Sequence, residues 1–432
     1  MAYQAPPITL DSSVWELTAV PAPPTQAVAR DVRSQVVVIG AGYTGLTAAL
    51  ALAEQGIAAT VVEAEKPGFG GSGRNGGQVI PGLKHDPDKL LKLLGERDGA
   101  KLIDFAGSLA SRTFEFIRRH RLDCDASDAG WIQPAVTKAQ LATVTKRAEQ
   151  WHRHAGLQSP VLDAAEIERM TGSRLYVGGW VDPRGGQLQP LSYVRELARC
   201  ALAAGIDVHT ASRATALSYD RGHWRLTVNG HEIRAEQVIV ATNAYSERLV
   251  PGLAESIFIA HSIQTATEPL PVSVQQEVLP GGLPVSDARR LLNYMRFDSA
   301  GRFLIGARGS FGDRQPERYF SRLRAAAAKM FPALANVRWQ RSWGGRIALT
   351  VDHLPHIHAP APGLYIGLGY NGRGVALASQ MGPLLAGLCV GTPTEDLPLP
   401  VTAARPIPFH HLHRPALETA AAWYRVLDGI GA

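Results

Sequence analysis

Apolar and polar positions near the start of the chain follow the pattern of a strand, a helix and a second strand. Residues 35–39, QVVVI, form a short apolar run rich in β-branched side chains, which is typical of a buried strand. The Ala- and Leu-rich stretch at 46–55 predicts a helix, and Gly56 follows it where a helix C-cap glycine belongs. Residues 58–63, AATVVE, predict the second strand. Together these segments predict a βαβ unit, which belongs to a parallel sheet.

The rest of the chain continues to mix helical and strand patterns, and its 432 residues allow two or three domains. The first 33 residues, with prolines at 21, 23 and 24, predict an irregular leader. The apolar periodicity predicts helices at 88–120, 138–157, 191–204, 322–330 and 375–388. It predicts strands at 177–182, 214–219, 224–228, 236–241, 256–267, 302–306 and 363–368.

Composition and charge exclude several classes of protein. Hydrophobic residues make up 45% and charged residues 19%, as in an ordinary globular protein. The net charge of +6 is spread along the chain without a Lys/Arg run, so we expect no nucleic-acid partner. Three well-separated cysteines favour a reducing compartment, and two histidine clusters lack the carboxylate partners of a metal site. The sequence shows neither a signal peptide nor an integral membrane segment, so we expect a cytoplasmic protein and leave peripheral membrane contact open.

A glycine pattern follows the first predicted strand. Gly40, Gly42 and Gly45 form G-x-G-x-x-G, in which the first glycine allows a tight turn, the second lets a pyrophosphate approach, and the third lets helix and strand pack closely. Glu63 ends the second strand, where an acidic residue hydrogen-bonds an adenosine ribose. The alternative is a plain glycine-rich turn. We favour a dinucleotide site, because turn, helix and acid occur together.

Three further segments carry candidate cofactor contacts. The glycine-rich loop at 67–82, PGFGGSGRNGGQVIPG, exposes many backbone N–H groups and offers Ser72, Arg74 and Asn75, although a flexible linker has a similar composition. The strand at 236–241 ends in small residues, which permit close approach of a backbone or cofactor. The segment 364–375, LYIGLGYNGRGV, places a glycine-rich turn and a cation at a helix N-terminus, which favours negative charge. A simple turn remains the alternative there.

Taken in order, VVVIGAGYTGLTAALALAEQG, VVEAEKPGFGGSGRNGGQV and GLGYNGRGVALASQMGPLLAG resemble FAD-dependent oxidoreductases of the D-amino-acid oxidase superfamily. GFGGSGRNGGQ resembles most the gamma-glutamylputrescine oxidoreductase branch. The resemblance implies an α/β fold with α+β elements, in which a Rossmann-like FAD-binding domain carries an inserted, mainly antiparallel substrate domain. It divides the chain into a leader at 1–33, an FAD domain at 34–90, 150–245 and 335–405, a substrate domain at 91–149 and 246–334, and a tail at 406–432.

The resemblance also implies which residues form the site. The expected FAD contacts are Gly40, Gly42, Tyr43, Thr44, Gly45, Glu63, Ala64, Ser72, Arg74, Asn75, Gly76, Gly77, Gln78, Ala214, Thr242, Asn243, Gly344, Gly372, Arg373, Gly374 and Val375. His261, Tyr294, Trp343 and Arg346 come from segments that would face the flavin ring. The two aromatic residues among them suit an amine cation. Arg346 suits a carboxylate, with Arg296, Arg308 and Arg373 as rivals.

The activity implied is oxidation of the C–H next to an amine nitrogen, with a hydride passing to flavin N5 and the imine hydrolysing. Relatives tether FAD through a cysteine before the last glycine segment or a histidine in the second glycine loop, and this chain has neither, so we expect non-covalent FAD. Where oxidases carry a lysine, residues 301–306 offer Arg302 and Leu304, so oxygen and a quinone or carrier both remain candidate acceptors. A gamma-glutamylated polyamine, a free amino acid and a cyclic imino acid remain open as substrates. A dehydrogenase of the same fold and a non-catalytic flavin subunit are the alternative functions.

Overall fold

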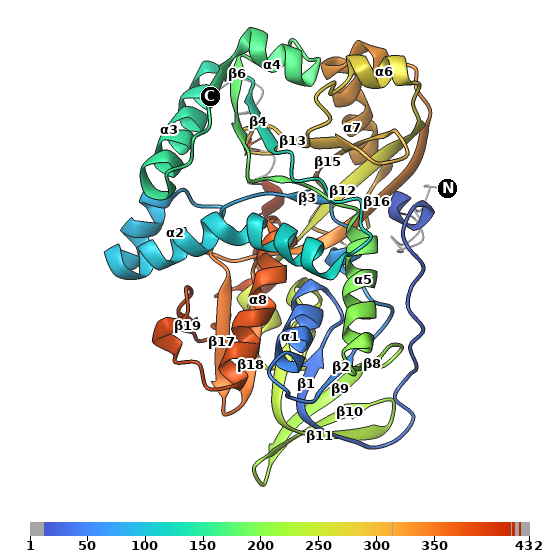
Figure 1. Ribbon diagram of the computed structural model, residues 1–432, viewed down its shortest axis with the longest axis vertical. Coiled ribbons are helices and arrows are strands. Elements are labelled where there is room, and N and C mark those ends of the chain that lie inside the picture. The colour runs from blue at the N-terminus through green and yellow to red at the C-terminus, as the bar shows by residue number, and fades with distance from the viewer. Residues whose placement is uncertain (1–12, 313, 416, 420–422, 425–432) are drawn as a thin grey trace.

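Two large sheets organise the chain in a computed structural model that describes residues 13–312, 314–415, 417–419 and 423–424. The first sheet, with the helices that cover it, occupies the lower part of Figure 1, and the second sheet the upper part. The long helix α2 (Pro87–His120) runs between them, with a kink at Gly95. Both the mixed α/β fold and the combination of parallel and antiparallel strands were predicted, and the architecture confirms them.

The first sheet contains the predicted βαβ unit at its centre. Its strands run in the order β19 (Val401–Thr402), β17 (His356–Ala361), β18 (Leu364–Leu368), β11 (His231–Val240), β1 (Val32–Ile39), β2 (Ala59–Val62) and β8 (Asp207–His209). The pairings from β18 to β8 are parallel, whereas β17 pairs antiparallel with β18. The meander of β9 (Ala214–Asp220) and β10 (His223–Val228) extends from β11. These strands confirm the runs predicted at 214–219, 224–228, 236–241 and 363–368.

Three helices cover this sheet and bring their ends to its carboxyl edge. They are α1 (Tyr43–Ala53), α5 (Pro190–Ala203) and α8 (Gly374–Cys389), which lie side by side in Figure 1. The backbones of α1 and α8 approach closely, because a Cβ at Gly382 would lie 2.1 Å from the Thr47 hydroxyl and 2.5 Å from the Ala48 nitrogen. Both helices therefore begin at the same place, beside the glycine turn that follows β1.

The second sheet is mainly antiparallel, as predicted. Its order is β16 (Trp339–Leu349), β12 (Phe258–Pro269), β15 (Arg302–Arg308), β14 (Tyr294–Phe297), β13 (Val285–Ser286), β4 (Trp131–Ala135), β6 (Gly178–Asp182) and β5 (Val161–Asp163). The helices α3 (Lys138–Ala155), α4 (Ala164–Thr171), α6 (Val272–Glu277) and α7 (Glu317–Met330) accompany it. A small separate pair joins β3 (Gln78–Val79) to β7 (Gly186–Gln187).

Strand pairing differs from the expected domain boundaries in two places. β5 and β6 fall within 150–245, which was expected in the FAD domain, yet they extend the second sheet beyond β4. β16 falls within 335–405 and also belongs to the second sheet, where it pairs along its length with β12. The reason is that these strands find antiparallel partners distant in sequence, and a local apolar pattern does not show which sheet a strand joins.

The leader is more ordered than the proline-rich sequence suggests. A short 3₁₀ helix, η2 (Val14–Leu17), places Trp15 in the core, where its indole nitrogen donates to the Asn75 carbonyl at 2.9 Å. Glu16 forms an ion pair with Arg195 at 2.8 Å. Thus the described part of the leader supports the second glycine loop from below. Much of the amphipathic tail expected after residue 406 lies outside the described residues.

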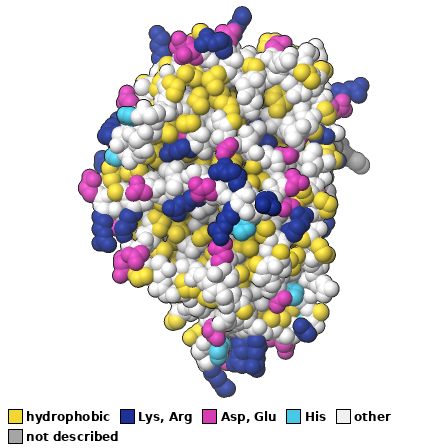
Figure 2. Space-filling model, in the orientation of Figure 1, with side chains coloured by type: hydrophobic (Ala, Val, Ile, Leu, Met, Phe, Trp, Pro, Cys, Tyr) yellow, Lys and Arg dark blue, Asp and Glu magenta, His cyan; other side chains and the backbone are white. Residues whose placement is uncertain are grey.

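Charge on the surface is mixed. On the face shown in Figure 2, Lys and Arg side chains are interspersed with Asp and Glu. In the described part of the chain, no helix combines the length and apolar character needed to cross a membrane.

Candidate active site

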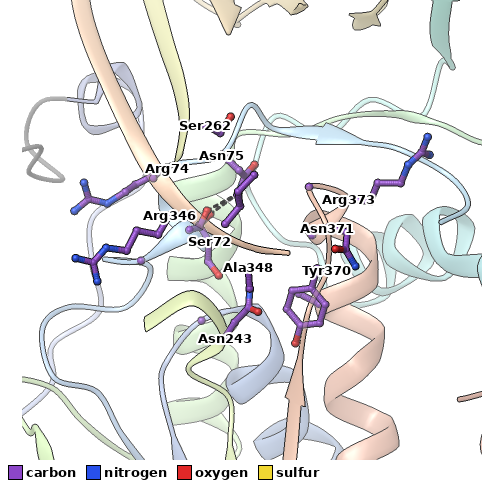
Figure 3. Close-up of a pocket in the computed structure, with 18 of the residues that line it drawn as sticks. Ser72, Arg74, Asn75, Asn243, Ser262, Arg346, Ala348, Tyr370, Asn371 and Arg373 are labelled. Carbon is purple, nitrogen blue, oxygen red and sulfur yellow. Dashed lines mark hydrogen bonds between the residues drawn. The ribbon is translucent and has the colours of Figure 1, made fainter. Parts of the chain in front are cut away.

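A cavity of about 1260 Å³ lies between the two sheets and takes its walls from both. Small-molecule sites usually measure roughly 300–1,000 Å³, so this volume leaves room for a large cofactor and a substrate together. One end is bordered by the glycine turn after β1 and by the end of β2, and the other by β12, β14 and β15. Figure 3 shows part of the lining, including Ser72, Asn243, Ser262 and Tyr370.

The glycine turn at the first end has the close contacts that a dinucleotide motif requires. Gly40 has a φ of +108°, which disfavours any side chain, and a Cβ at Gly45 would lie 1.9 Å from the Gly40 carbonyl oxygen. Gly42 is the N-cap of α1 and, with Tyr43 and Thr44, lines the cavity. The N-terminus of α1 therefore opens on the cavity, where its dipole and N–H groups favour an anion.

Glu63 lies at the end of β2 and ties this turn to the sheet. Its carboxylate accepts hydrogen bonds from the backbone nitrogens of Ala41 at 2.8 Å and Glu65 at 3.0 Å. Burial raises its pKa despite these two bonds. Ala64 and Ala214 also border this end of the cavity, which is closed by an ion pair that the sequence did not reveal, between Arg213 and Glu65 at 3.3 Å.

The second glycine loop folds back against the first. The Ser72 hydroxyl accepts a hydrogen bond from the Tyr43 backbone nitrogen at 3.1 Å, so it lies at the N-terminus of α1. The Asn75 amide donates to the carbonyls of Ser72 (2.8 Å, Figure 3) and Gly71 (3.1 Å), and its oxygen accepts from the Gly77 nitrogen. Asn75 therefore fixes the loop with most of its hydrogen-bonding capacity, although it borders the cavity.

Arg74 also serves the loop. Its Nε donates to the Phe69 carbonyl at 2.5 Å, and its own carbonyl accepts from Gln264 at 2.7 Å and Trp343 at 3.0 Å. In Figure 3, the side chains of Arg74 and Arg346 extend away from Tyr370 and Arg373.

The strand end after β11 and the start of α8 complete this wall. Asn243, with a φ of +44°, accepts a hydrogen bond from the Gly369 nitrogen at 3.0 Å, and Thr242 pairs with Ser246. The Tyr370 hydroxyl lies 2.6 Å from that of Thr44, which joins the beginnings of α1 and α8. The cavity lining here includes the predicted Thr242, Asn243, Gly344, Gly372, Arg373, Gly374 and Val375.

Arg373, the residue before α8, faces the second sheet. Its guanidinium donates to the Pro81 carbonyl at 2.6 Å and lies 5.8 Å from the centre of the Trp131 ring. Burial lowers its pKa to about 10. Since α8 has no side-chain N-cap and its first residues line the cavity, its positive end and Arg373 both favour negative charge at this point.

These features fit the FAD that the sequence implies. Glycines without room for a Cβ bring backbone to the cavity at the first turn, and two helix N-termini open on the same space. The cysteines, Cys124, Cys200 and Cys389, are absent from the described lining, which agrees with non-covalent binding.

Three of the four residues predicted near the flavin ring reach the cavity. His261, Tyr294 and Arg346 line it, and the Tyr294 hydroxyl lies 2.6 Å from the Ser262 hydroxyl. Burial raises the pKa of Tyr294. The Arg346 guanidinium lies 5.6 Å from the centre of the Tyr245 ring. The sequence analysis did not assign a role to Tyr245, which also contacts the loop at Gly70.

Trp343 does not line the cavity, and neither do Gly45 and Gly77, so their expected contacts with substrate or cofactor need correction. Trp343 is fully buried, and its ring meets that of Trp15 edge to face at 6.0 Å. A Cβ at Gly77 would lie 2.2 Å from the Leu188 carbonyl oxygen, so this glycine serves close backbone packing. Arg296, a rival for the carboxylate, is buried outside the lining and donates to the Leu188 carbonyl.

The far end of the cavity contains charged residues that the sequence analysis missed. Lys84 and Arg147 line it beside the previously considered Arg308 and Arg373. The pKa of Lys84 is lowered to about 8, first by burial and then by the three nearby guanidinium groups. Asp287 is fully buried among backbone and side-chain donors, and burial raises its pKa to about 6. Long side chains from separate segments meet here, so no local motif could reveal them.

Comparison with known proteins supports the same fold and cofactor. Residues 35–388 match the family described as FAD dependent oxidoreductase (DAO). A gamma-glutamylputrescine oxidoreductase of Escherichia coli is 31% identical over 97% of this chain and 99% of its own length. A probable oxidoreductase OrdL of Haemophilus influenzae is 32% identical over 83% of each chain.

Solved structures show the fold. The glycine oxidase of Geobacillus kaustophilus superposes with a TM-score of 0.71 at 22% identity, covering 84% of this chain and 96% of the oxidase. An iminodiacetate oxidase of Chelativorans sp. BNC1 gives a TM-score of 0.70, also at 22% identity, over 83% of this chain and 96% of its own. The chain therefore belongs to the DAO family of FAD-dependent oxidoreductases, whose members act on amines or amino acids.

Proposed function

We propose that this enzyme oxidises the C–H next to the amine nitrogen of a small amine that also carries a carboxylate. The observation that carries the proposal is one continuous cavity that joins the glycine turn after β1 to polar side chains of the second sheet. Cofactor and substrate would share this space without a barrier between them. The family supplies the reaction class, and the cavity supplies the shape and charge that suit this type of substrate.

The residues at the first end would hold FAD in two parts. Gly40, Gly42 and Glu63 suit the adenosine and pyrophosphate half, because they combine close backbone approach with a carboxylate at the end of β2. The start of α8 with Arg373 suits the carbonyl side of the flavin ring. When bound, FAD supplies the acceptor for a hydride from the substrate carbon, and the resulting imine is hydrolysed.

The second sheet would position the substrate. Tyr294 and Ser262 form a hydrogen-bonded pair at 2.6 Å on adjoining parts of the wall, and Trp131 offers its ring nearby. The raised pKa of Tyr294 keeps its hydroxyl protonated at neutral pH, so it orients the amine rather than removing a proton. An amine that arrives neutral needs no side-chain base, because its lone pair assists loss of the hydride.

Anaerobic reduction of the bound flavin tests this function. The purified yellow protein is mixed with gamma-glutamylputrescine, glycine, iminodiacetate and pipecolate, and flavin absorbance is followed without oxygen. We expect bleaching by at least one amine with a carboxylate and none by the corresponding compound without an amine. A flavin that stays oxidised with every amine would overturn the proposal and favour a non-catalytic flavin subunit.

A dehydrogenase that passes electrons to a quinone or carrier is a second candidate, supported by one observation. Lys84 is the only lysine among the described residues of the cavity lining, and the strand β15 offers none. Rapid peroxide formation in air by the substrate-reduced enzyme would identify an oxidase. Slow reaction with air together with fast reduction of a quinone would identify the dehydrogenase.

A further inference from the structure

Positive charge is concentrated at the end of the cavity away from Glu63. Lys84, Arg147, Arg308 and Arg373 all line this part, and each guanidinium is close enough to Lys84 to lower its pKa. Of the acidic residues in the described lining, Asp287 alone lies at this end, since the others are Glu63 and its neighbours Glu65 and Glu247 beside Arg213. An anionic group would thus be favoured at this end.

Most of these cations already have protein partners. Arg147 binds the Asp86 carboxylate through two hydrogen bonds of 2.5 and 3.1 Å, and Arg373 is held by the Pro81 carbonyl. Arg289 neutralises Asp287 at 3.3 Å. These contacts give the wall its shape, but they leave little capacity for a ligand.

Lys84 and Arg308 differ from their neighbours. Neither side chain has a hydrogen bond or ion pair with any residue in the described part of the chain, and Arg308 has only a ring contact with Phe311, at 5.7 Å. Lys84 follows the second glycine loop, where the cavity adjoins a smaller groove bordered by Asp86 and Lys89. Arg308 ends β15, opposite Ser262 of β12. Two unpaired cations from different domains' walls thus border one space.

We propose that Lys84 and Arg308 together bind a carboxylate of the substrate, so that the enzyme prefers amines carrying this group over neutral or purely cationic amines. The proposal rests on the proposed function, because it makes the bound anion part of the oxidised molecule. A guanidinium offers a carboxylate two parallel hydrogen bonds, and the ammonium adds a charge from the opposite wall. Binding would also relieve the repulsion among the cations that now surround Lys84.

The experiment compares two non-oxidisable probes, glutarate and its neutral diamide glutaramide, on the FAD-loaded enzyme. Binding is followed through the flavin absorption spectrum in the wild type and in Lys84→Met and Arg308→Met. We expect each substitution to weaken glutarate binding by about 10- to 150-fold, as for a lost hydrogen bond to a charged group, and to leave glutaramide nearly unchanged. Lys84→Arg keeps the charge and should retain most of the affinity for glutarate.

Matched controls remove a charge of the same kind elsewhere. Lys92→Met on α2 and Arg318→Met on α7 change exposed residues outside the cavity lining and should bind glutarate as the wild type does. Unchanged glutarate affinity in both cavity variants would overturn the proposal. Equal losses for glutarate and glutaramide would also overturn it, since they indicate a distorted cavity.

The flavin-reduction assay separates this proposal from the proposed function. If the variants behave as expected and amines reduce the flavin, both stand. If glutarate binding follows the expected pattern but no amine reduces the flavin, the proposed function fails, and the assignment of the carboxylate to a substrate fails with it. If amines reduce the flavin while both cavity variants keep full affinity for glutarate, the function stands and the carboxylate site is overturned.

Discussion

The two ends of the cavity are built by different means. At the first end, glycines and helix N-termini bring backbone to the ligand, and the side chain of Glu63 binds backbone nitrogens. At the other end, long cationic side chains from β3's following loop, α3, β15 and the start of α8 meet across open space. The first end depends on the absence of side chains, and the second on their charge. Substitutions should therefore act differently at each end.

The largest effect is expected where a side chain has no room. Gly45→Ala would place a Cβ 1.9 Å from the Gly40 carbonyl oxygen, which is backbone and cannot turn aside. We expect this variant to lose nearly all bound flavin, measured as the ratio of flavin to protein absorbance after purification. Gly56→Ala is the control, because it ends the same helical segment with nothing within 4 Å of its Cβ and pays only for its φ of +74°. Equal flavin content in the two variants would contradict the packing argument.

Gly42→Val tests whether the first end recognises FAD through its backbone. The first atom met by a new Cβ is the Ser72 hydroxyl oxygen at 2.9 Å, which belongs to a small side chain. If the pyrophosphate also approaches this glycine, Gly42→Val abolishes FAD binding, and adding Ser72→Ala does not restore it. Flavin fluorescence titration of the apoprotein measures both variants. Recovery of binding in the double variant would mean that Gly42 only makes room for Ser72.

How far the sequence predicted the site follows from this same difference. Gly40, Glu63, Asn243 and Arg373 belong to short segments in which strand, turn and helix follow one another, so their positions could be inferred locally. Lys84 and Arg308 lie on loops and strands far apart in sequence, and only the pairing of β12 with β15 and the path of the second loop bring them to one space.

Trp343 and Arg346 show a second limit of the sequence interpretation. Both were expected to face the flavin ring, but they lie three positions apart on the strand β16. Alternate residues of a strand point to opposite faces, so an odd spacing separates them. Trp343 accordingly packs into the core and Arg346 reaches the cavity. The membership of β16 in the second sheet was missed for a related reason, since its partner β12 lies more than one helix away in sequence.

A smaller effect is expected from pH, and it concerns the charged end alone. Lys84 is surrounded by Arg147, Arg308, Arg373, Asp86, His85 and His353, and its pKa in the free protein is lowered to about 8. Its ammonium form attracts a carboxylate, so glutarate affinity should be complete well below pH 8 and fall as pH rises through that value. The loss approaches about tenfold per pH unit at most, if one proton is linked to binding. Lys84→Arg should remove this dependence, because arginine stays charged. FAD binding should not follow the same profile, and a shared profile would contradict the separation of the two ends.

The smallest effect on activity is expected from Trp343→Phe, which touches neither end. The substitution removes the hydrogen bond from the indole nitrogen to the Arg74 carbonyl at 3.0 Å and reduces the edge-to-face contact with Trp15. Loss of one such hydrogen bond costs about 0.5–1.5 kcal/mol, so the unfolding free energy should fall by a comparable amount, measured by urea denaturation of the holoenzyme. The rate constant for anaerobic flavin reduction should stay close to that of the wild type, because the ring lies outside the cavity lining. A variant with unchanged stability and a much slower reduction would instead return Trp343 to the catalytic role that its sequence position suggested.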